Sequence, residues 1–313
     1  MNPNTTTSAA LRELPPSSLA PVIAAISESA FAALRALAPE GVDVRRLRDG
    51  LEEAAFVVPR SEDTSGLDGL ADLEVVQTLS AGTDWIEPHV PPWATLCNAR
   101  GTRDIPVAEW VIGALLSAVY GQLRAARERT WADAQPGELH GMTVLIVGHG
   151  SIGRAVQARL EPFGVRVVGV ASRARHGVHG VDELPVLLGT ADAVVVLAPL
   201  TDATRGLVDA AFLARMRDGA LLLNAGRGAV LDTDALVAEL ARGRLRAVLD
   251  VTDPEPLPGD HPLWGLALAI TPHNAGDTVA ADERAIRLAA EQLGRFARGE
   301  PLENVVRAGA SGP

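Results

Sequence analysis

Residues 143–153, TVLIVGHGSIG, join a continuous apolar run to a turn that carries three glycines. An apolar run bounded by a glycine turn is typical of a buried strand. Gly148 permits the tight turn, Gly150 lets backbone approach a pyrophosphate, and Gly153 lets the next helix pack closely. A helical pattern follows, so free N–H groups of a helix N-terminus face the same turn. The context disfavours a plain glycine-rich turn and predicts a dinucleotide site made by Gly148, His149, Gly150, Ser151, Ile152 and Gly153. His149 is expected to be a solvent-facing filler.

Further apolar runs indicate a parallel sheet. With helical patterns between them, runs without alternation are typical of strands covered on both faces. We expect an α/β protein: a Rossmann-type doubly wound domain at 100–282, and a second, discontinuous domain at 1–99 and 283–313. The 313 residues also exceed a comfortable single core. The segments concerned are strands near 165–170, 193–197, 220–223 and 247–251, a strand at 73–79, an α/β segment at 21–58 and one long helix at 107–129.

Composition narrows the partners. The chain is 47% hydrophobic and 21% charged, with a net charge of −11, which argues against nucleic acid or an anionic membrane as the main partner. The single cysteine, Cys97, excludes an intrachain disulfide and fits the cytoplasm. No stretch approaches the roughly 20 apolar residues of a membrane span. Residues 1–18 lack the pattern of a signal peptide and are expected to be a frayed tail.

The end of the next strand predicts which dinucleotide binds. A carboxylate there would hold the ribose 2′-hydroxyl of NAD. Ser172 lies 19 residues after Gly153, and Ser172-Arg173-Ala174-Arg175 contains no acid. A hydroxyl and two arginines suit a 2′-phosphate, so NADP(H) is favoured and NAD(H) remains possible. The alternative is that both arginines are solvated loop charges.

Three segments follow predicted strands at the edge where open α/β sheets bind ligands. They carry Arg227, Glu255 and His273, respectively, and they are LNAGRG (223–228), LDVTDPEPL (249–257) and ITPHNAG (270–276). Each has an ordinary explanation alone: an ion-pair arginine, a surface carboxylate, and a capping or core histidine. His176 and His179 could suggest a metal site, but the loop offers no third ligand, so no metal is expected.

Taken together and in this order, the segments resemble the D-isomer-specific 2-hydroxyacid dehydrogenase family, particularly its glyoxylate/hydroxypyruvate reductases. The resemblance covers most of the chain and thins in the first 60 residues. It rests on VQTLSAGTDWI (76–86), LCNARG (96–101), VAEW (107–110), ELHG (138–141), LAPLTDATRGLV (197–208), HPLW (261–264) and PLENVV (301–306), besides the three segments above.

The resemblance implies roles that chemistry supports. Arg227 would bind a 2-oxo acid's carboxylate and polarise its carbonyl. His273 would be the general acid and base, with Glu255 orienting it so that a proton is available. The backbone N–H groups of Ala81 and Gly82 would form a second carboxylate clamp, and a substrate bridging the domains would draw them together.

The same resemblance implies the rest of the site and the assembly. The second domain would be flavodoxin-like, and the helix from Val107 would contact a second subunit, making a homodimer through the Rossmann domain; packing within one subunit is the alternative for this helix. Independently of the resemblance, Trp85 follows the substrate loop and is a candidate to line the pocket. The further cofactor-binding positions are Ala198, Pro199, Leu200, Thr204, Ala225, Gly226, Asp250 (near the nicotinamide carboxamide) and Gly276.

We therefore expect reduction of a small 2-oxo acid such as glyoxylate or hydroxypyruvate. Formate dehydrogenase should carry glutamine where Glu255 stands. A D-3-phosphoglycerate dehydrogenase-like enzyme would prefer NAD and often carry a regulatory domain, for which the seven residues after Val306 leave no room. A dinucleotide-sensing binding protein on the same scaffold is the alternative of another class.

Overall fold

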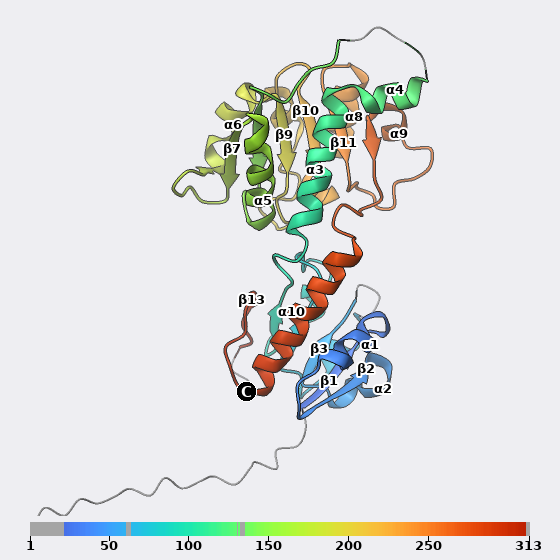
Figure 1. Cartoon of the computed structure of the whole chain (residues 1–313), viewed down its shortest axis with the longest axis vertical. Coiled ribbons are helices and arrows are strands. Elements are labelled where there is room, and N and C mark those ends of the chain that lie inside the picture. The colour runs from blue at the N-terminus through green and yellow to red at the C-terminus, as the bar shows by residue number, and fades with distance from the viewer. Residues whose placement is uncertain (1–21, 61–63, 130, 132–134, 311–313) are drawn as a thin grey trace, which may run out of the picture.

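The computed structural model describes residues 22–60, 64–129, 131 and 135–310, and the tail expected at 1–18 lies outside them. Two lobes are visible, each built on one β-sheet (Figure 1). The smaller lobe holds a six-stranded sheet of order β13-β5-β4-β3-β1-β2, in which only β13 is antiparallel to its neighbour. Its strands are β1 Val22–Ile26, β2 Val42–Arg46, β3 Phe56–Val58, β4 Val75–Gln77, β5 Thr95–Cys97 and β13 Val305–Arg307.

The larger lobe holds a seven-stranded, wholly parallel sheet of order β12-β11-β10-β9-β6-β7-β8. The chain builds β6, β7 and β8 outward and then returns to the other side of β6 with β9. This reversal is the point at which doubly wound sheets bind ligands. The strands are β6 Thr143–Val147, β7 Arg166–Ala171, β8 His179–Gly180, β9 Ala193–Val196, β10 Leu221–Asn224, β11 Arg246–Leu249 and β12 Ala269–Ile270.

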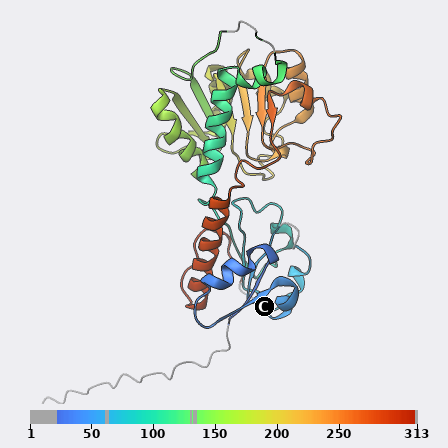
Figure 2. The same ribbon diagram turned by 45° about the vertical axis from the view of Figure 1, so that its right-hand side comes forward.

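Helices connect the strands of both lobes. The α-helices are α1 Glu28–Leu37, α2 Leu47–Gly50, α3 Asp104–Val119, α4 Gln122–Glu128, α5 Ser151–Leu160, α6 Leu184–Leu187, α7 Ala210–Arg215, α8 Thr233–Ala241, α9 Leu263–Leu266 and α10 Val279–Ala297. Short 3-10 helices lie at Leu51–Glu53, Leu67–Gly69, Glu87–His89, Glu161–Phe163, Val181–Glu183, Leu188–Thr190 and Gly228–Val230. The long helix α10 returns to the smaller lobe and packs beside α1 (Figure 2).

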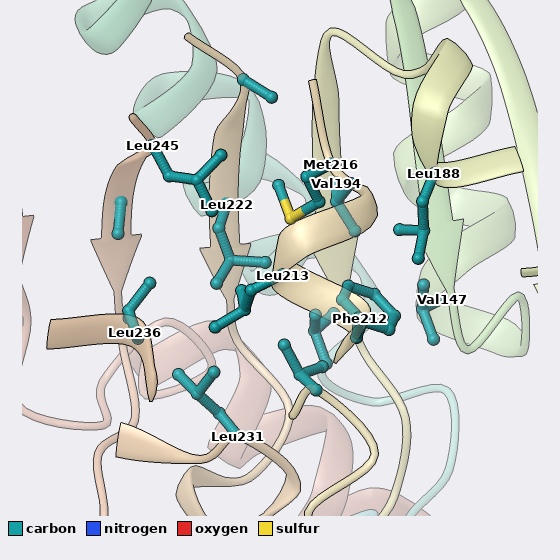
Figure 3. Packing of buried hydrophobic residues seen from close by; sticks show 14 of the residues in the cluster. Val147, Leu188, Val194, Phe212, Leu213, Met216, Leu222, Leu231, Leu236 and Leu245 are labelled. Atoms are coloured by element: carbon teal, nitrogen blue, oxygen red, sulfur yellow. The ribbon is translucent and has the colours of Figure 1, made fainter. Parts of the chain in front are cut away.

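The larger sheet is covered on both faces, as its uninterrupted apolar strands predict. Successive side chains of a strand point to opposite faces. Leu145 and Leu222 face a core closed by α6, α7, α8 and α9, which Figure 3 shows from close by. Val144 and Ile146 face a second core closed by α3 and α5. The predicted α/β class and the predicted strands are confirmed, with boundaries shifted by one or two residues.

The single helix predicted at 107–129 is wrong. Two helices occupy that region, and α4 is bent 65° from α3. Gly121 separates them with a φ of 70°, a left-handed conformation that glycine adopts without steric cost. The apolar pattern continues across this break, which is why periodicity alone does not detect it.

The bent pair of α3 and α4 is the one candidate for a membrane span among the described residues. Across the described ranges, no helix by itself has the length and apolar character to cross a membrane, while α3 and α4 together satisfy the test by length and composition. Seven side chains of α3 are buried inside the larger lobe.

Shortening Leu222 tests the core on the α6–α9 face. The residue is fully buried on β10, so Leu222→Ala should lower the free energy of unfolding by roughly 2–5 kcal/mol through lost apolar contact and the cavity left behind. The measurement is urea unfolding followed by circular dichroism. Val186 is 76% exposed on α6, and Val186→Ala should change stability by no more than about 0.5 kcal/mol. Equal effects of the two substitutions would contradict this packing.

Candidate active site

The glycine turn lies between β6 and α5 and has the shape that a pyrophosphate needs. Gly148 has a φ of 101°, and a Cβ there would lie 2.5 Å from the backbone of Leu197 and Ala198. A Cβ on Gly153 would lie 2.9 Å from the carbonyl oxygen of Gly148. Over Gly150, in contrast, the space within 4 Å is open. The two outer glycines are therefore required for packing, while the middle one leaves room for a ligand.

Helix α5 begins at Ser151, and no side chain caps its first N–H groups. The Ser151 hydroxyl donates instead to Asp104 of α3. The uncapped amides and the positive end of the helix face the open space over Gly150, an arrangement that favours an anion. The residues present thus fit a dinucleotide pyrophosphate.

His149 does not face solvent, and that expectation is wrong. His149 is 5% exposed. Its ring lies over Gly169 of β7, and a Cβ on Gly169 would lie 2.6 Å from the ring. Its Nε2 is 2.6 Å from Oε1 of Gln157, and its buried Nδ1 has no partner in the described part of the chain. Because Gly169 has no side chain, the neighbouring strand leaves room for the imidazole.

The basic segment directly follows β7, as predicted. All four residues, from Ser172 to Arg175, are exposed. The Arg175 guanidinium donates to the carbonyl oxygen of His149, which ties this segment to the glycine turn. Arg173 is exposed and has no hydrogen bond or ion pair within the described residues, so its guanidinium is available to an anion.

In the loop after β9, the contacts with neighbouring segments and within the loop are made mainly by backbone atoms. A Cβ on Gly226 would lie 2.8 Å from the carbonyl oxygen of Ala198. The hydroxyl of Thr204 donates to the carbonyl oxygen of Pro199 at 2.5 Å and accepts from the amide of Thr201 at 2.8 Å. Leu200 packs partly buried against the core. Pro199 and Thr204 therefore shape the loop at the edge of the turn.

His273 and Glu255 meet after β12 and β11. The Nδ1 of His273 is 2.6 Å from Oε1 of Glu255, and both side chains are about two-fifths exposed. His273 has a φ of 52°, an uncommon backbone conformation for a residue other than glycine. The carboxylate accepts from, and thereby orients, the imidazole, whose Nε2 is left for a ligand.

The buried carboxylate of Asp250 holds the loop that carries His273. It accepts from the Thr271 hydroxyl at 2.5 Å, the Asn274 amide at 3.0 Å and the Ala275 amide at 3.1 Å. The Thr271 hydroxyl in turn accepts from the indole of Trp110 on α3 at 3.1 Å. Asp250 is 2% exposed. The position predicted to lie near the nicotinamide thus also organises the histidine loop.

Arg227 follows β10 and reaches across to the smaller lobe. Its Nη1 donates to the carbonyl oxygen of Gly226 at 2.9 Å, and its Nε lies 3.1 and 3.2 Å from the two carboxylate oxygens of Asp84. A Cβ on Gly82 would lie 1.7 Å from Nη2 of Arg227. Sequence reasoning missed Asp84, although an acid two residues after the predicted carboxylate clamp was a usable signal.

The loop that carries Ala81 and Gly82 has its carbonyl groups occupied. The Ala81 oxygen accepts from Asn98 at 2.8 Å, and the Gly82 oxygen accepts from Ser80 at 2.8 Å and from Trp85 at 3.2 Å. Among residues 22–60, 64–129, 131 and 135–310, no hydrogen bond uses the amides of Ala81 or Gly82. These two donors remain available to an anion, as the predicted clamp requires.

A cavity of about 480 Å³ brings residues of both lobes together. Gly276 is also tied to the junction between the lobes, because its carbonyl oxygen accepts from Arg103 at 2.5 Å. Glu255 stands behind His273, while Ser172–Arg175 and Ala198–Thr204 lie outside the lining. The predicted residues that line the cavity are Ala81, Gly82, Trp85, Ile152, Ala225, Arg227, Asp250, His273 and Gly276.

A second cavity of about 470 Å³ lies between α10 and the end of α1. Arg298 pairs with Glu300 of the same lining at 2.7 Å, while Arg295 pairs with Glu303 and Arg287 with Glu283, two acids outside the lining. It offers no arrangement for catalysis. In the described residues, no group of three or more His, Cys, Asp or Glu could hold a metal ion, and His179 bonds Glu183 at 2.8 Å.

Adding a methyl group to Gly82 tests the placement of Arg227. Because the new Cβ would occupy the space of Nη2, Gly82→Ala should displace the guanidinium and lower kcat/KM roughly 100-fold, the scale of a misplacement of about 1 Å. Steady-state kinetics and titration with the dinucleotide are the measurements, and dinucleotide affinity should be retained. Gly69 has open space around it in the same lobe, so Gly69→Ala is the matched control. A fully active Gly82→Ala variant would contradict the geometry.

Comparison with known proteins identifies a common family. Residues 111–275 match the family model described as D-isomer specific 2-hydroxyacid dehydrogenase, NAD binding domain. A glyoxylate reductase of Thermofilum pendens is 33% identical over 260 residues, covering 76% of this chain and 76% of its own. A D-3-phosphoglycerate dehydrogenase of Methanocaldococcus jannaschii is 33% identical over 281 residues, which cover 84% of this chain. The chain spans about half, 51%, of that longer relative.

A solved structure agrees with the sequence matches. The chain resembles an NADPH-dependent glyoxylate/hydroxypyruvate reductase of Sinorhizobium meliloti in complex with NADP and sulfate, with a TM-score of 0.80 and 28% identity. The superposition covers 91% of this chain and 98% of that one. The likeness therefore extends over both lobes.

Proposed function

Because the chain belongs to the D-isomer-specific 2-hydroxyacid dehydrogenase family and is an NAD(P)-dependent oxidoreductase, we propose that it reduces a small 2-oxo acid to the D-2-hydroxy acid with NADPH. One observation carries the proposal. Arg227, His273, Ala81 and Gly82 line one cavity together with Ile152 of the glycine turn, and Glu255 bonds His273 from outside that lining. Within the described residues, the amides of Ala81 and Gly82 have no hydrogen-bond partner. Anion-binding donors and a histidine that can transfer a proton are what reduction of a 2-oxo acid requires.

The chain's own residues divide the work. The amides of Ala81 and Gly82 and the terminal nitrogens of Arg227 bind the substrate carboxylate, and Arg227 polarises the adjacent carbonyl. The bound dinucleotide supplies the hydride that reaches the carbonyl carbon. Nε2 of His273 gives its proton to the carbonyl oxygen, while Glu255 holds Nδ1. In the reverse direction, neutral His273 takes the hydroxyl proton.

The preference for NADP(H) rests on the end of β7. An acid that would bind the 2′-hydroxyl of NAD is missing from Ser172–Arg175, and Arg173 is exposed beside the turn. A guanidinium there pairs a 2′-phosphate. The similar reductase from Sinorhizobium meliloti binds NADP, which supports the same choice.

Two organisational features belong to this proposal. The substrate domain comprises 1–99 and 283–313, and the Rossmann domain comprises 100–282. Two subunits pair through the Rossmann domain, which is supported by large apolar side chains exposed near α3 and α4: Tyr120 is 48% exposed and Trp131 fully exposed.

The compartment proposed for this enzyme is the reducing cytoplasm, which is supported by the single cysteine of the sequence, Cys97, being buried and free.

The reaction itself is tested by NADPH oxidation with a panel of glyoxylate, hydroxypyruvate and 3-phosphohydroxypyruvate. Turnover should appear with the small acids. His273→Ala should lower kcat roughly 10²–10⁴-fold, because the proton donor is lost, while NADPH affinity by fluorescence titration stays nearly unchanged.

His89→Ala, an exposed histidine outside the cavity lining, should leave kcat as it is. A fully active His273→Ala variant would overturn the mechanism. Turnover confined to the phosphorylated acid with NADH would favour a D-3-phosphoglycerate dehydrogenase-like activity. Tight NADPH binding with no turnover on any acid would favour a dinucleotide sensor.

Cofactor choice is tested by Arg173→Ala. Losing a charge-assisted contact of about 1.5–3 kcal/mol should weaken NADPH binding roughly 10- to 100-fold, with little effect on NADH. Calorimetric titration of both dinucleotides measures the ratio. Arg215→Ala on α7, whose side chain bonds its own helix, is the control and should change neither affinity. Equal loss for both dinucleotides would assign Arg173 a general surface role.

A further inference from the structure

Asp84 contacts the guanidinium of Arg227 from the opposite lobe. Both oxygens of its carboxylate lie within 3.2 Å of Nε, and the two side chains are 28% and 25% exposed. The pair joins the loop after β4 to the loop after β10. With Nε bonded to Asp84 and Nη1 to the Gly226 carbonyl, Nη2 is the guanidinium nitrogen that has no hydrogen-bond partner within the described residues.

The remaining nitrogens of Arg227 have defined surroundings. Nη1 donates one hydrogen to the carbonyl oxygen of Gly226. Nη2 lies against the Cα of Gly82, beside the amides that no other group in the described chain uses. A guanidinium is planar and carries its five donors in a fixed fork. Holding Nε therefore also sets the direction of Nη2.

The loop itself does not need the Asp84 carboxylate. The amide of Ile86 donates to the carbonyl oxygen of Thr83 at 3.0 Å. The indole of Trp85 bonds Ser80 and Gly82, and Asn98 holds Ala81. Within the described residues, Arg227 is the only side chain that bonds the Asp84 carboxylate. The carboxylate thus acts on Arg227 and not on its own loop.

We propose that Asp84 is a positioning residue for the reduction: it holds Nε of Arg227 so that the terminal nitrogens point at the substrate carboxylate and carbonyl. This inference rests on the proposed function. The Asp84 carboxylate places a negative charge next to Arg227, a residue that lines the cavity. This charge weakens the electrostatic attraction between the cavity and an anionic substrate. Its benefit must therefore appear in the orientation of Arg227 during the chemical step.

The charge and the orientation make opposite predictions for substitution. If Asp84 positions Arg227, Asp84→Ala should lower kcat about 10- to 100-fold, since a poorly oriented donor loses most of its stabilisation of the developing charge. KM should change no more than about threefold. Asp84→Asn keeps an oxygen acceptor for Nε and should recover most of kcat. If Asp84 only competes with substrate, both variants should lower KM and leave kcat unchanged.

A double substitution isolates the pair. In an Arg227→Lys background the side chain has no second donor edge to be held, so Asp84→Ala should cost less than about twofold there. Asp72→Ala, an exposed acid of the same lobe outside the cavity, is the control. Equal costs of Asp84→Ala in both backgrounds would overturn the proposal, as would a kcat unaffected by Asp84→Ala.

A crystal structure of ligand-free Asp84→Ala provides a readout that needs no substrate. The guanidinium of Arg227 should leave its place against Gly82, while the loop at 80–86 keeps its course. An unmoved guanidinium would refute positioning by Asp84. If the unmodified protein reduces no 2-oxo acid, the proposed function fails, and this structural result still decides the role of Asp84.

Discussion

A parallel sheet places the carboxyl ends of all its strands at one edge, and the candidate active site depends on this constraint. The glycine turn follows β6, the basic segment follows β7, and Ala198 follows β9. Arg227, Asp250 and Thr271 follow β10, β11 and β12 in the same way. Ile152 and Gly276, more than 120 positions apart in the chain, thereby line one cavity with Arg227 and Asp250. The basic segment and Ala198 lie at the same edge of the sheet, outside that lining.

The Asp250 carboxylate converts that edge into a site with defined geometry. A buried carboxylate is costly unless donors compensate for lost water, and here a hydroxyl and two amides do so. The same bonds fix the loop in which His273 adopts a positive φ. The indole of Trp110 extends the network to α3. Burial of Asp250 and orientation of His273 are therefore parts of one arrangement.

The sequence pattern predicted correctly those elements that depend on residues close together in the chain. The apolar runs and glycine turn around β6 depend on residues adjacent in the chain, and they were found. The break at Gly121 was not found, because the apolar periodicity of α3 continues beyond it. His149 was misjudged because its burial depends on Gly169, which lies on another strand. Asp84 was missed because its partner, Arg227, lies in the other lobe.

The roles of Arg227, Glu255 and His273 came from the family resemblance, since each has an ordinary structural explanation when considered alone. The folded structure adds information that the order of residues in the sequence does not contain, namely which backbone N–H groups of the described residues have no hydrogen-bond partner. Ala81 and Gly82 matter because their carbonyls are occupied and their amides are not. That distinction depends on Asn98, Ser80 and Trp85, whose contacts only the folded chain creates.

Hydrogen bonds also hold the chain together where it passes between the lobes. Arg103 bonds Asp277 at 2.8 Å and Asp282 at 3.0 Å, and Arg284 donates to the carbonyl oxygen of Thr102 at 2.9 Å. These bonds tie the outgoing and returning segments of the chain to each other. A few residues at such a crossing absorb the change in angle when domains close. Asp84 and Arg227 belong to different lobes and are in direct contact, so a change in the angle between the lobes would act on this contact and on the direction of the guanidinium.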